Sequence, residues 1–215
     1  MYGEQHPSVA TYLSNIGGAW RALEDAQKAL QHHEQALAIS KKVYGEQHPR
    51  VAASLSNMGG AWRALGDAQK ALQHHEQALA ISKKVYGEQH PDVATYLNNI
   101  GDDWRALGYA QKALQHYKQA LVINKKVYGE QHPDVAILLN NIGAVYHKLG
   151  DSSRAMHYCN AAYQMALQLP GMGPDHPETK LYKGWLDDVS QPASEGKQSS
   201  HVASPSGKKQ KCVVM

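Results

Sequence analysis

The chain has 215 residues, of which 42% are hydrophobic, and its formal net charge is +3. This hydrophobic content is enough for a buried core, while Cys159 and Cys212 are too few and too far apart for a disulfide framework or a zinc site. The whole charge excess lies in residues 190–215, so the rest of the chain is neutral, and nucleic-acid binding, which needs a basic face, is not expected.

The hexapeptide YGEQHP opens a repeating unit. It begins at Tyr2, Tyr44, Tyr86 and Tyr128, a spacing of 42 residues each time. A period of this length, with strong helical periodicity and no strand signals, predicts an α-solenoid built from helix pairs. The N-terminal segment has neither a basic region nor an apolar run, so no signal peptide is expected. Because Met1 opens directly on repeat sequence, we expect either a frayed first repeat or a piece of a longer array.

The second unit shows how one repeat is punctuated. Pro49 suits the first turn of a helix, where its missing N–H costs nothing. Gly66 is expected to end that helix in the left-handed conformation, and Asp67 to cap a second helix that runs to about Tyr86. In the first unit Glu24 replaces the turn glycine, which should weaken the turn by up to ~1 kcal/mol. Similar helix pairs are predicted around residues 7–43, 91–128 and 133–168.

A further start signal, GPDHPET, follows the fourth unit at residues 173–179. Leu181, Trp185, Leu186 and Val189 come after it at helical spacing. Because a solenoid needs a cap over its last hairpin, a capping helix is predicted at about 177–189. The repeats themselves are predicted to span about 2–43, 44–85, 86–127 and 128–171 of a domain that covers residues 1–189.

Small and large residues recur at fixed places in every unit. The first helix carries Gly17, Gly59, Gly101 and Gly143, then a large aromatic at Trp20, Trp62, Trp104 and Tyr146. The second helix carries two alanine positions, Ala29, Ala71, Ala113 and Ala155, then Ala36, Ala78, Ala120 and Ala162. This pattern resembles the tetratricopeptide repeat, in the 42-residue subtype of kinesin light chains and nephrocystin-like proteins. The resemblance implies an all-α, right-handed α-solenoid of four helix-turn-helix repeats with a C-terminal capping helix, which acts as a protein-binding scaffold rather than an enzyme.

In this family the first helices line a concave groove. The resemblance places two sets of residues there, Asn15, Asn57, Asn99 and Asn141, and then Arg21, Arg63, Arg105 and His147. Asparagine can donate to and accept from a peptide backbone, and arginine can hold a carboxylate in a fork. These residues together resemble a groove for an extended protein or peptide ligand with some preference for acidic residues. The alternative is that they persist only because the repeats were copied recently.

Two departures limit the resemblance. The chaperone-binding members of the family carry a lysine one turn before the asparagine, where this chain has Thr11, Ala53, Thr95 and Ile137. A carboxylate clamp for chaperone tails is therefore not expected. In the third unit Asp102 replaces Gly60 of the second, and we expect it to face the groove and to offset Arg105 in part.

Histidine is abundant, but its spacing does not indicate catalysis. The neighbours His32 and His33 point about 100° apart on a helix, so they are poorly placed to hold one metal ion, and the pair His74 and His75 repeats that arrangement. His33, His75, Tyr117 and Cys159 share one position of the second helix, and the resemblance implies that residues at this position pack between helices. No phosphate loop, dinucleotide fingerprint or catalytic triad spacing is visible, so no cofactor, metal or catalytic residue is predicted.

The composition changes at about residue 190, and residues 190–215 are rich in Ser, Lys, Gly and Pro, so this segment is expected to be disordered. Its last four residues, CVVM, match the C-a-a-X signal at which a prenyltransferase would farnesylate Cys212. The segment resembles the tails of farnesylated Ras-family GTPases. Nearby lysines would add attraction to an anionic membrane surface. These are Lys208, Lys209 and Lys211.

Two functions remain open from the sequence. The first is an adaptor that binds a partner in its groove and is tethered to the cytoplasmic face of a membrane through Cys212. The second is a soluble repeat array, or a fragment of a larger multidomain signalling protein, without a lipid anchor.

Overall fold

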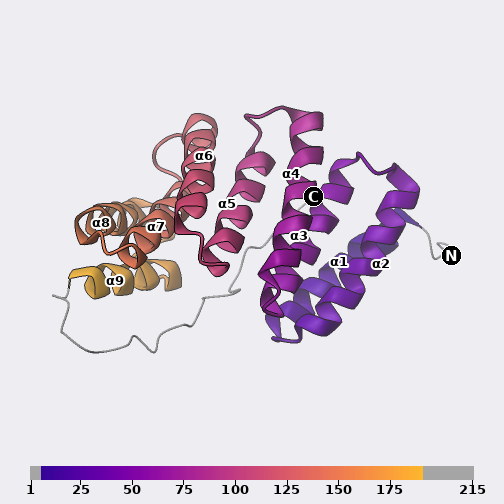
Figure 1. Ribbon diagram of the computed structural model, residues 1–215, viewed down its shortest axis with the longest axis horizontal. Helices are drawn as coiled ribbons and strands as arrows, with labels where there is room; N and C mark the ends of the chain where they lie inside the picture. Colours follow the sequence, from indigo (N-terminus) through magenta and orange to yellow (C-terminus); the bar gives the residue numbers. More distant parts are fainter. Residues whose placement is uncertain (1–5, 191–215) are drawn as a thin grey trace. The chain divides into compact units, whose positions relative to one another are not determined.

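The computed structural model describes residues 6–190, and this part of the chain contains nine α-helices and no strand (Figure 1). The helices are α1 (Pro7–Ala22), α2 (Ala26–Tyr44), α3 (Pro49–Ala64), α4 (Ala68–Tyr86), α5 (Pro91–Ala106), α6 (Ala110–Tyr128), α7 (Pro133–Lys148), α8 (Ser152–Gln168) and α9 (Pro177–Ser190). Their order and pairwise packing confirm the all-helical repeat fold predicted from the sequence. The predicted lipidation residue Cys212 and the three tail lysines lie outside the described residues.

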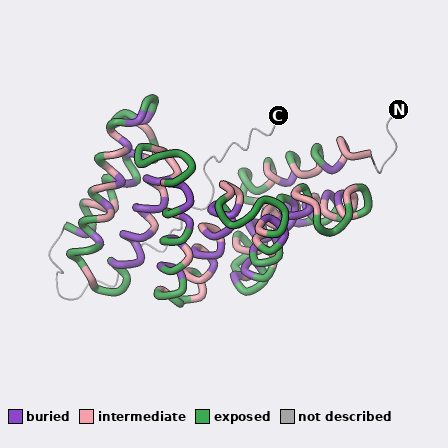
Figure 2. The backbone as a smooth tube through the Cα atoms, turned by 90° about the horizontal axis from the view of Figure 1, so that it is seen from above, coloured by how far each residue is buried: buried purple, intermediate pink, exposed green. Residues whose placement is uncertain are grey.

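The chain divides into two compact units, and the division lies between Ile81 and Ser82, inside α4. The first unit contains α1, α2, α3 and most of α4. There, α1 packs on α2 and α2 packs on α3. The second unit contains the end of α4 and α5 to α9, in which each helix from α5 to α8 packs on the next one along the chain. Buried and exposed residues alternate along the helices, as amphipathic helices require (Figure 2).

Each first helix begins at the histidine and proline of the YGEQHP hexapeptide. The backbone N–H of Arg50 donates to Nδ1 of His48 at 3.2 Å, so His48 caps α3. The His48 ring also stacks on the Tyr44 ring, with centroids 4.5 Å apart. The same cap forms at His6, His90 and His132. The sequence placed these histidines before a proline but did not predict their capping role, because histidine is not among the favoured N-cap residues.

The turns between paired helices follow the predicted punctuation. Gly66 has a φ of +85°, in the left-handed region. Asp67 then caps α4, since its Oδ1 accepts from the backbone N–H of Lys70 at 3.0 Å. In the first repeat Glu24 adopts the same left-handed conformation, with a φ of 63°, although it carries a side chain. The turn therefore keeps its geometry in the first repeat at a conformational cost that glycine avoids.

A close approach between the two helices of a repeat explains the recurring glycine of the first helix. A Cβ atom on Gly101 would lie 2.5 Å from the Tyr117 ring of α6. The same contact joins Gly17 to His33, Gly59 to His75 and Gly143 to Cys159. All four of these second-helix residues are buried, with at most 1% of their surface exposed. They pack between helices, as the sequence indicated, and burial raises the pKa of Cys159 to about 11, which keeps its thiol protonated.

The first helix α1 lacks a partner on one face among the described residues. Ile16 is 43% exposed, whereas Met58, the equivalent residue of α3, is 6% exposed and packs in a cluster with Leu30 of α2. Tyr12, one turn earlier on α1, is likewise exposed. The face that buries α3 against α2 is thus left open on α1.

The last helix, α9, covers α8 and the neighbouring part of α7. Tyr182 of α9 joins a buried cluster with Val135 of α7 and Ala162 of α8. The buried Thr179 hydroxyl donates to the backbone carbonyl of Met172 at 2.9 Å. Leu181, which the sequence assigned to the covering face, is instead exposed, because the buried face of α9 follows Thr179, Tyr182 and Val189.

Candidate protein-binding surfaces

A row of mostly short side chains runs along each first helix at spacings of three and four residues, which places its members on one face. We call it the first-helix stripe, and on α5 it consists of Thr95, Asn99, Asp102 and Ala106. Its equivalents are Thr11, Asn15, Gly18 and Ala22 on α1, Ala53, Asn57, Gly60 and Ala64 on α3, and Ile137, Asn141, Ala144 and Lys148 on α7. On α3 and α5 both ends of the stripe are exposed. The short, exposed residues at these ends leave room for the backbone of a ligand there.

The four predicted asparagines lie on this stripe in different environments. Asn15 is exposed, whereas Asn57, Asn99 and Asn141 are half-buried. The side-chain amide of Asn141 donates to Oδ1 of Asn98 at 3.0 Å, which links α7 to α5. One donor of Asn141 is therefore engaged within the second unit. Asn98 was not among the predicted residues, and the available signal was that asparagine replaces the serine of the first two repeats at this position.

The four predicted cationic side chains differ in how far they are exposed. Arg21 and His147 are exposed, whereas Arg63 and Arg105 are half-buried. Arg21 reaches across to α3, because its Nη1 lies 2.6 Å from the point where a Cβ on Gly60 would stand. The missing side chain of Gly60 thus makes room for a guanidinium from the preceding repeat.

Asp102 was expected to face a ligand, but its carboxylate is directed into its own repeat. The Tyr117 hydroxyl donates to Oδ1 of Asp102 at 2.7 Å, and Nη2 of Arg105 approaches the same oxygen at 3.5 Å. Burial and the charge of Asp102 raise the pKa of Tyr117 well above its ordinary value, so the phenol remains a donor. The physical reason for the difference is that the buried Tyr117 hydroxyl needs an acceptor, which Asp102 supplies.

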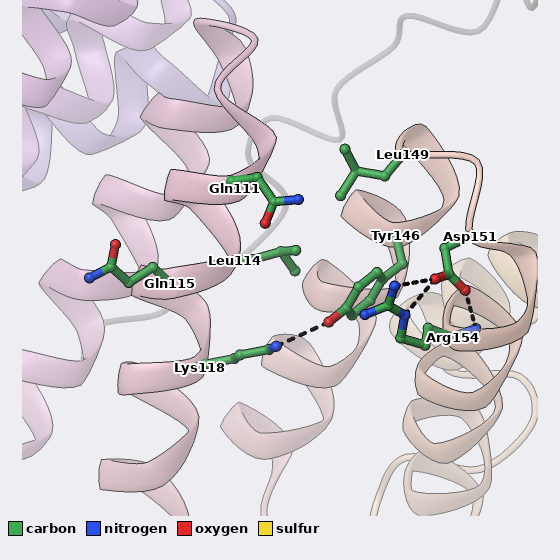
Figure 3. A pocket seen from close by; sticks show the side chains of 8 residues that line it. All are labelled: Gln111, Leu114, Gln115, Lys118, Tyr146, Leu149, Asp151 and Arg154. Atoms are coloured by element: carbon green, nitrogen blue, oxygen red, sulfur yellow. Dashed lines mark hydrogen bonds and ion pairs between the residues drawn. The ribbon is translucent and has the colours of Figure 1, made fainter.

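A cavity of about 510 Å³ opens in the second unit between α6, the end of α7 and the start of α8 (Figure 3). Its lining is Gln111, Leu114, Gln115, Lys118, Tyr146, Leu149, Asp151 and Arg154. Nζ of Lys118 donates to the Tyr146 hydroxyl at 3.0 Å, and Arg154 pairs with Asp151. We call this cavity the α6–α8 pocket. The sequence reasoning missed it because its residues come from three helical segments.

Two cations converge on one phenol in this pocket. The guanidinium of Arg154 lies 4.5 Å from the centroid of the Tyr146 ring. The hydrogen bond from Lys118, together with the charges of Lys118 and Arg154, lowers the pKa of Tyr146 below its ordinary value despite some desolvation. The other repeats carry the same cation–aromatic contact as Lys28 over Trp20, Lys70 over Trp62 and Lys112 over Trp104. The stacked cation is therefore a recurring structural feature, and the addition of Lys118 is particular to this pocket.

The part of the chain that the structure describes has neither a metal-binding cluster nor a membrane-spanning helix. Between residues 6 and 190, no group of three or more His, Cys, Asp or Glu side chains is arranged to hold a metal ion. Among these described helices, none has the length together with the hydropathy that a bilayer crossing requires.

The sequence matches the tetratricopeptide repeat family over residues 8–83, 52–121 and 105–168, which together cover most of the chain. The chain belongs to the tetratricopeptide repeat family. Proteins built from tetratricopeptide repeats generally serve as protein-interaction scaffolds, and they bind protein or peptide partners. No curated protein matches the sequence.

Solved structures of tetratricopeptide repeat proteins resemble this one. BtubC (BKLC) from P. vanneervenii has a TM-score of 0.75 and 24% identity, over 85% of this chain and 72% of that protein. A putative kinesin light chain of Podosopora anserina with nearly identical repeats has a TM-score of 0.70 and 23% identity, over 86% of each chain. A substituted form of that putative kinesin light chain has a TM-score of 0.71 and 21% identity, over 88% of this chain and 87% of that one. At these identities the similarity shows the fold alone.

Proposed function

We propose that this tetratricopeptide repeat chain is a protein-interaction scaffold whose first-helix stripe binds an extended peptide or partner segment. The observation that carries the proposal is made separately in each unit: the stripe of α3 in the first unit and the stripe of α5 in the second are each exposed at both ends and carry a half-buried asparagine between those ends. A ligand backbone can approach such a row closely, and asparagine can pair with both the N–H and the C=O of that backbone. The exposed Arg21 of the first unit and the exposed His147 of the second would each contact ligand side chains beside the stripe of their own unit.

The structure supports a weaker acidic preference at Arg105 than the sequence suggested. Its guanidinium is half-buried and already lies beside the Asp102 carboxylate. An acidic ligand residue at this place would have to compete with an existing carboxylate. The stripe of the second unit is therefore proposed to bind mainly the ligand backbone, through the remaining polar groups of Asn99 and Asn141.

A steric block on the stripe tests this proposal. Peptides are first selected on the full chain from a phage-displayed random library, and their affinities are then measured for Thr95→Trp and Val122→Trp. Both positions are exposed and β-branched, but Thr95 lies on the stripe of α5 and Val122 on α6, a second helix. Thr95→Trp is expected to weaken binding by about tenfold or more, which corresponds to ~1.4 kcal/mol, and Val122→Trp by less than about twofold. Equal loss in both variants, or a library that yields no binder, would contradict the proposal.

The second part of the proposal concerns residues 190–215, and it rests on their sequence. If CVVM ends the mature protein, a prenyltransferase can farnesylate Cys212 and so tether the scaffold to the cytoplasmic face of a membrane. A single lipid chain binds membranes only marginally. Lys208, Lys209 and Lys211 would each add about 1 kcal/mol on an anionic surface, which together gives reversible anchoring.

Cell fractionation decides between the tethered scaffold and its alternative, a soluble array or a fragment of a larger multidomain signalling protein. The full chain, expressed in eukaryotic cells, is expected to distribute to membranes and to carry a mass increase of one farnesyl group at Cys212. Cys212→Ser should lose both the added mass and the membrane fraction. Identical distribution of the two proteins would favour the alternative, and it would leave the scaffold function of the stripe intact.

A further inference from the structure

The α6–α8 pocket differs from its counterpart in the first unit at three of eight positions. Lys118 replaces Glu34, Tyr146 replaces Trp62, and Arg154 replaces Lys70. The other five positions carry identical residues in the two places, namely Gln, Leu and Gln on the second helix and Leu and Asp at the turn. Because α6 is nearly a copy of α2, the exchange of Glu34 for Lys118 stands out as a change of chemistry on a constant helix, whereas Tyr146 and Arg154 belong to the more divergent fourth unit.

These exchanges invert the charge of the surface. The first-unit set has one cation, Lys70, against two carboxylates, Glu34 and Asp67. The α6–α8 pocket has two cations, Lys118 and Arg154, against the single carboxylate of Asp151. The first-unit set is therefore acidic, and the α6–α8 pocket is basic.

The pocket also keeps donors that its own carboxylate does not use. Oδ2 of Asp151 accepts a hydrogen bond from Nε of Arg154 and forms an ion pair with Nη2 of the same guanidinium. Nη1 of Arg154 lies outside that ion pair. Among the described residues Lys118 donates only to the Tyr146 hydroxyl, so two of its three hydrogens are unused. The amides of Gln111 and Gln115 line the same space, and the side chains of Leu114 and Leu149 give it an apolar wall. A group that accepts several hydrogen bonds and has an apolar neighbour fits this combination.

We propose that the α6–α8 pocket binds an anionic side chain of a partner protein, a carboxylate or a phosphoryl group, next to an apolar residue. The anion lies between Lys118 and Arg154 and accepts from both. The adjacent apolar side chain packs on Leu114 and Leu149. This site uses a second helix and the following turn, so it is separate from the first-helix stripe and goes beyond the function proposed for it.

Three blocked pentapeptides test the proposal on the full chain. They share leucine on both sides of a central residue, which is glutamate, phosphoserine or glutamine. Backbone amide resonances are followed by NMR during titration. The glutamate peptide, the phosphoserine peptide or both are expected to shift the resonances of Lys118, Tyr146 and Arg154, and the glutamine peptide is not. Binding of only one charged peptide identifies the source of the anion as a carboxylate or as a phosphorylated residue.

The residues at equivalent positions of the other repeats provide the matched variants. Lys118→Glu restores the residue of the first two repeats, so the fold should persist, and it is expected to weaken binding by about tenfold or more. Lys126→Glu makes the same charge change at an exposed position of α6 outside the pocket, and it should change affinity by less than about twofold. The double variant Glu34→Lys, Trp62→Tyr builds the basic set in the first unit and is expected to add a second binding site for the charged peptide.

Three outcomes would overturn the proposal. The first is equal shifts with the glutamine peptide, which would mean that leucine alone is recognised. The second is equal weakening by Lys118→Glu and Lys126→Glu, which would mean that only the general charge of the chain matters. The third is the absence of shifts at the three pocket residues with either charged peptide. If Lys118→Glu proved unstable, the stoichiometry of the double variant would decide.

Discussion

Gly101→Ala is expected to destabilise the second unit by about 2 kcal/mol, although alanine is the better helix former. An exposed mid-helix exchange of glycine for alanine normally gains up to ~1 kcal/mol. Here the added Cβ would stand 2.5 Å from the fully buried Tyr117 ring, whose hydroxyl is held by Asp102. The ring cannot move away without strain or loss of that hydrogen bond, and overpacking of this kind costs about 1–3 kcal/mol.

Gly18→Ala is the control for this prediction. A Cβ at Gly18 would have no neighbour within 4 Å, so the helix propensity gain of up to ~1 kcal/mol should appear without a penalty. Thermal and urea denaturation, followed by circular dichroism, would show a lower midpoint for Gly101→Ala and an unchanged or higher one for Gly18→Ala. A higher midpoint for Gly101→Ala would show that the two helices can separate at little cost.

Acidification from pH 7 to pH 4 is expected to remove up to about 3 kcal/mol from the first unit through His33 alone. This side chain is 1% exposed, and neither ring nitrogen has a hydrogen-bond partner among the described residues. Burial, with a smaller effect from the charges of Arg21 and His32, lowers the pKa of His33 from 6.5 to about 4. Between these two values the unfolded chain binds a proton that the folded chain does not. Stability is therefore full above pH 6.5 and falls as the pH approaches 4.

His33→Cys isolates this effect. Cysteine occupies the equivalent position of the fourth repeat, as Cys159 opposite Gly143, so the exchange suits the close contact with the first helix. Urea denaturation at pH 7, 5.5 and 4 should give a smaller loss of stability for the variant than for the parent chain. Parallel losses in the two proteins would assign the acid sensitivity to other groups.

Much of the fold could be predicted because its signals are local. Pro49 begins α3, Gly66 ends its turn at positive φ, and Asp67 caps α4, and each of these acts through its own backbone and the next few residues. Because the units are near copies of one another, the same helix boundaries could be predicted in each of them. Only the buried face of α9 was misjudged in part, because its sequence is not copied from another repeat and Leu181 and Tyr182 are neighbours that both suit a buried face.

The candidate sites were less predictable, since they depend on contacts between helices. The Asn141–Asn98 hydrogen bond joins two first helices, and the Tyr117–Asp102 bond joins the two helices of one repeat. Neither pairing follows from spacing along one helix. Lys118 could have been noticed in the sequence, because the first two repeats have glutamate at this position. Its contact with Tyr146 could not, because Tyr146 lies 28 residues further along the chain.

The sequence by itself determined where the helices begin and end, because capping groups, prolines and left-handed glycines act within a few residues. Only the tertiary structure decided which copies of a residue remain accessible. Tyr12 and Tyr96 are the same residue at the same place in the repeat, yet Tyr12 is 65% exposed and Tyr96 is 6% exposed. The physical reason is that exposure depends on what packs against a helix, and near-identical repeats do not have identical neighbours.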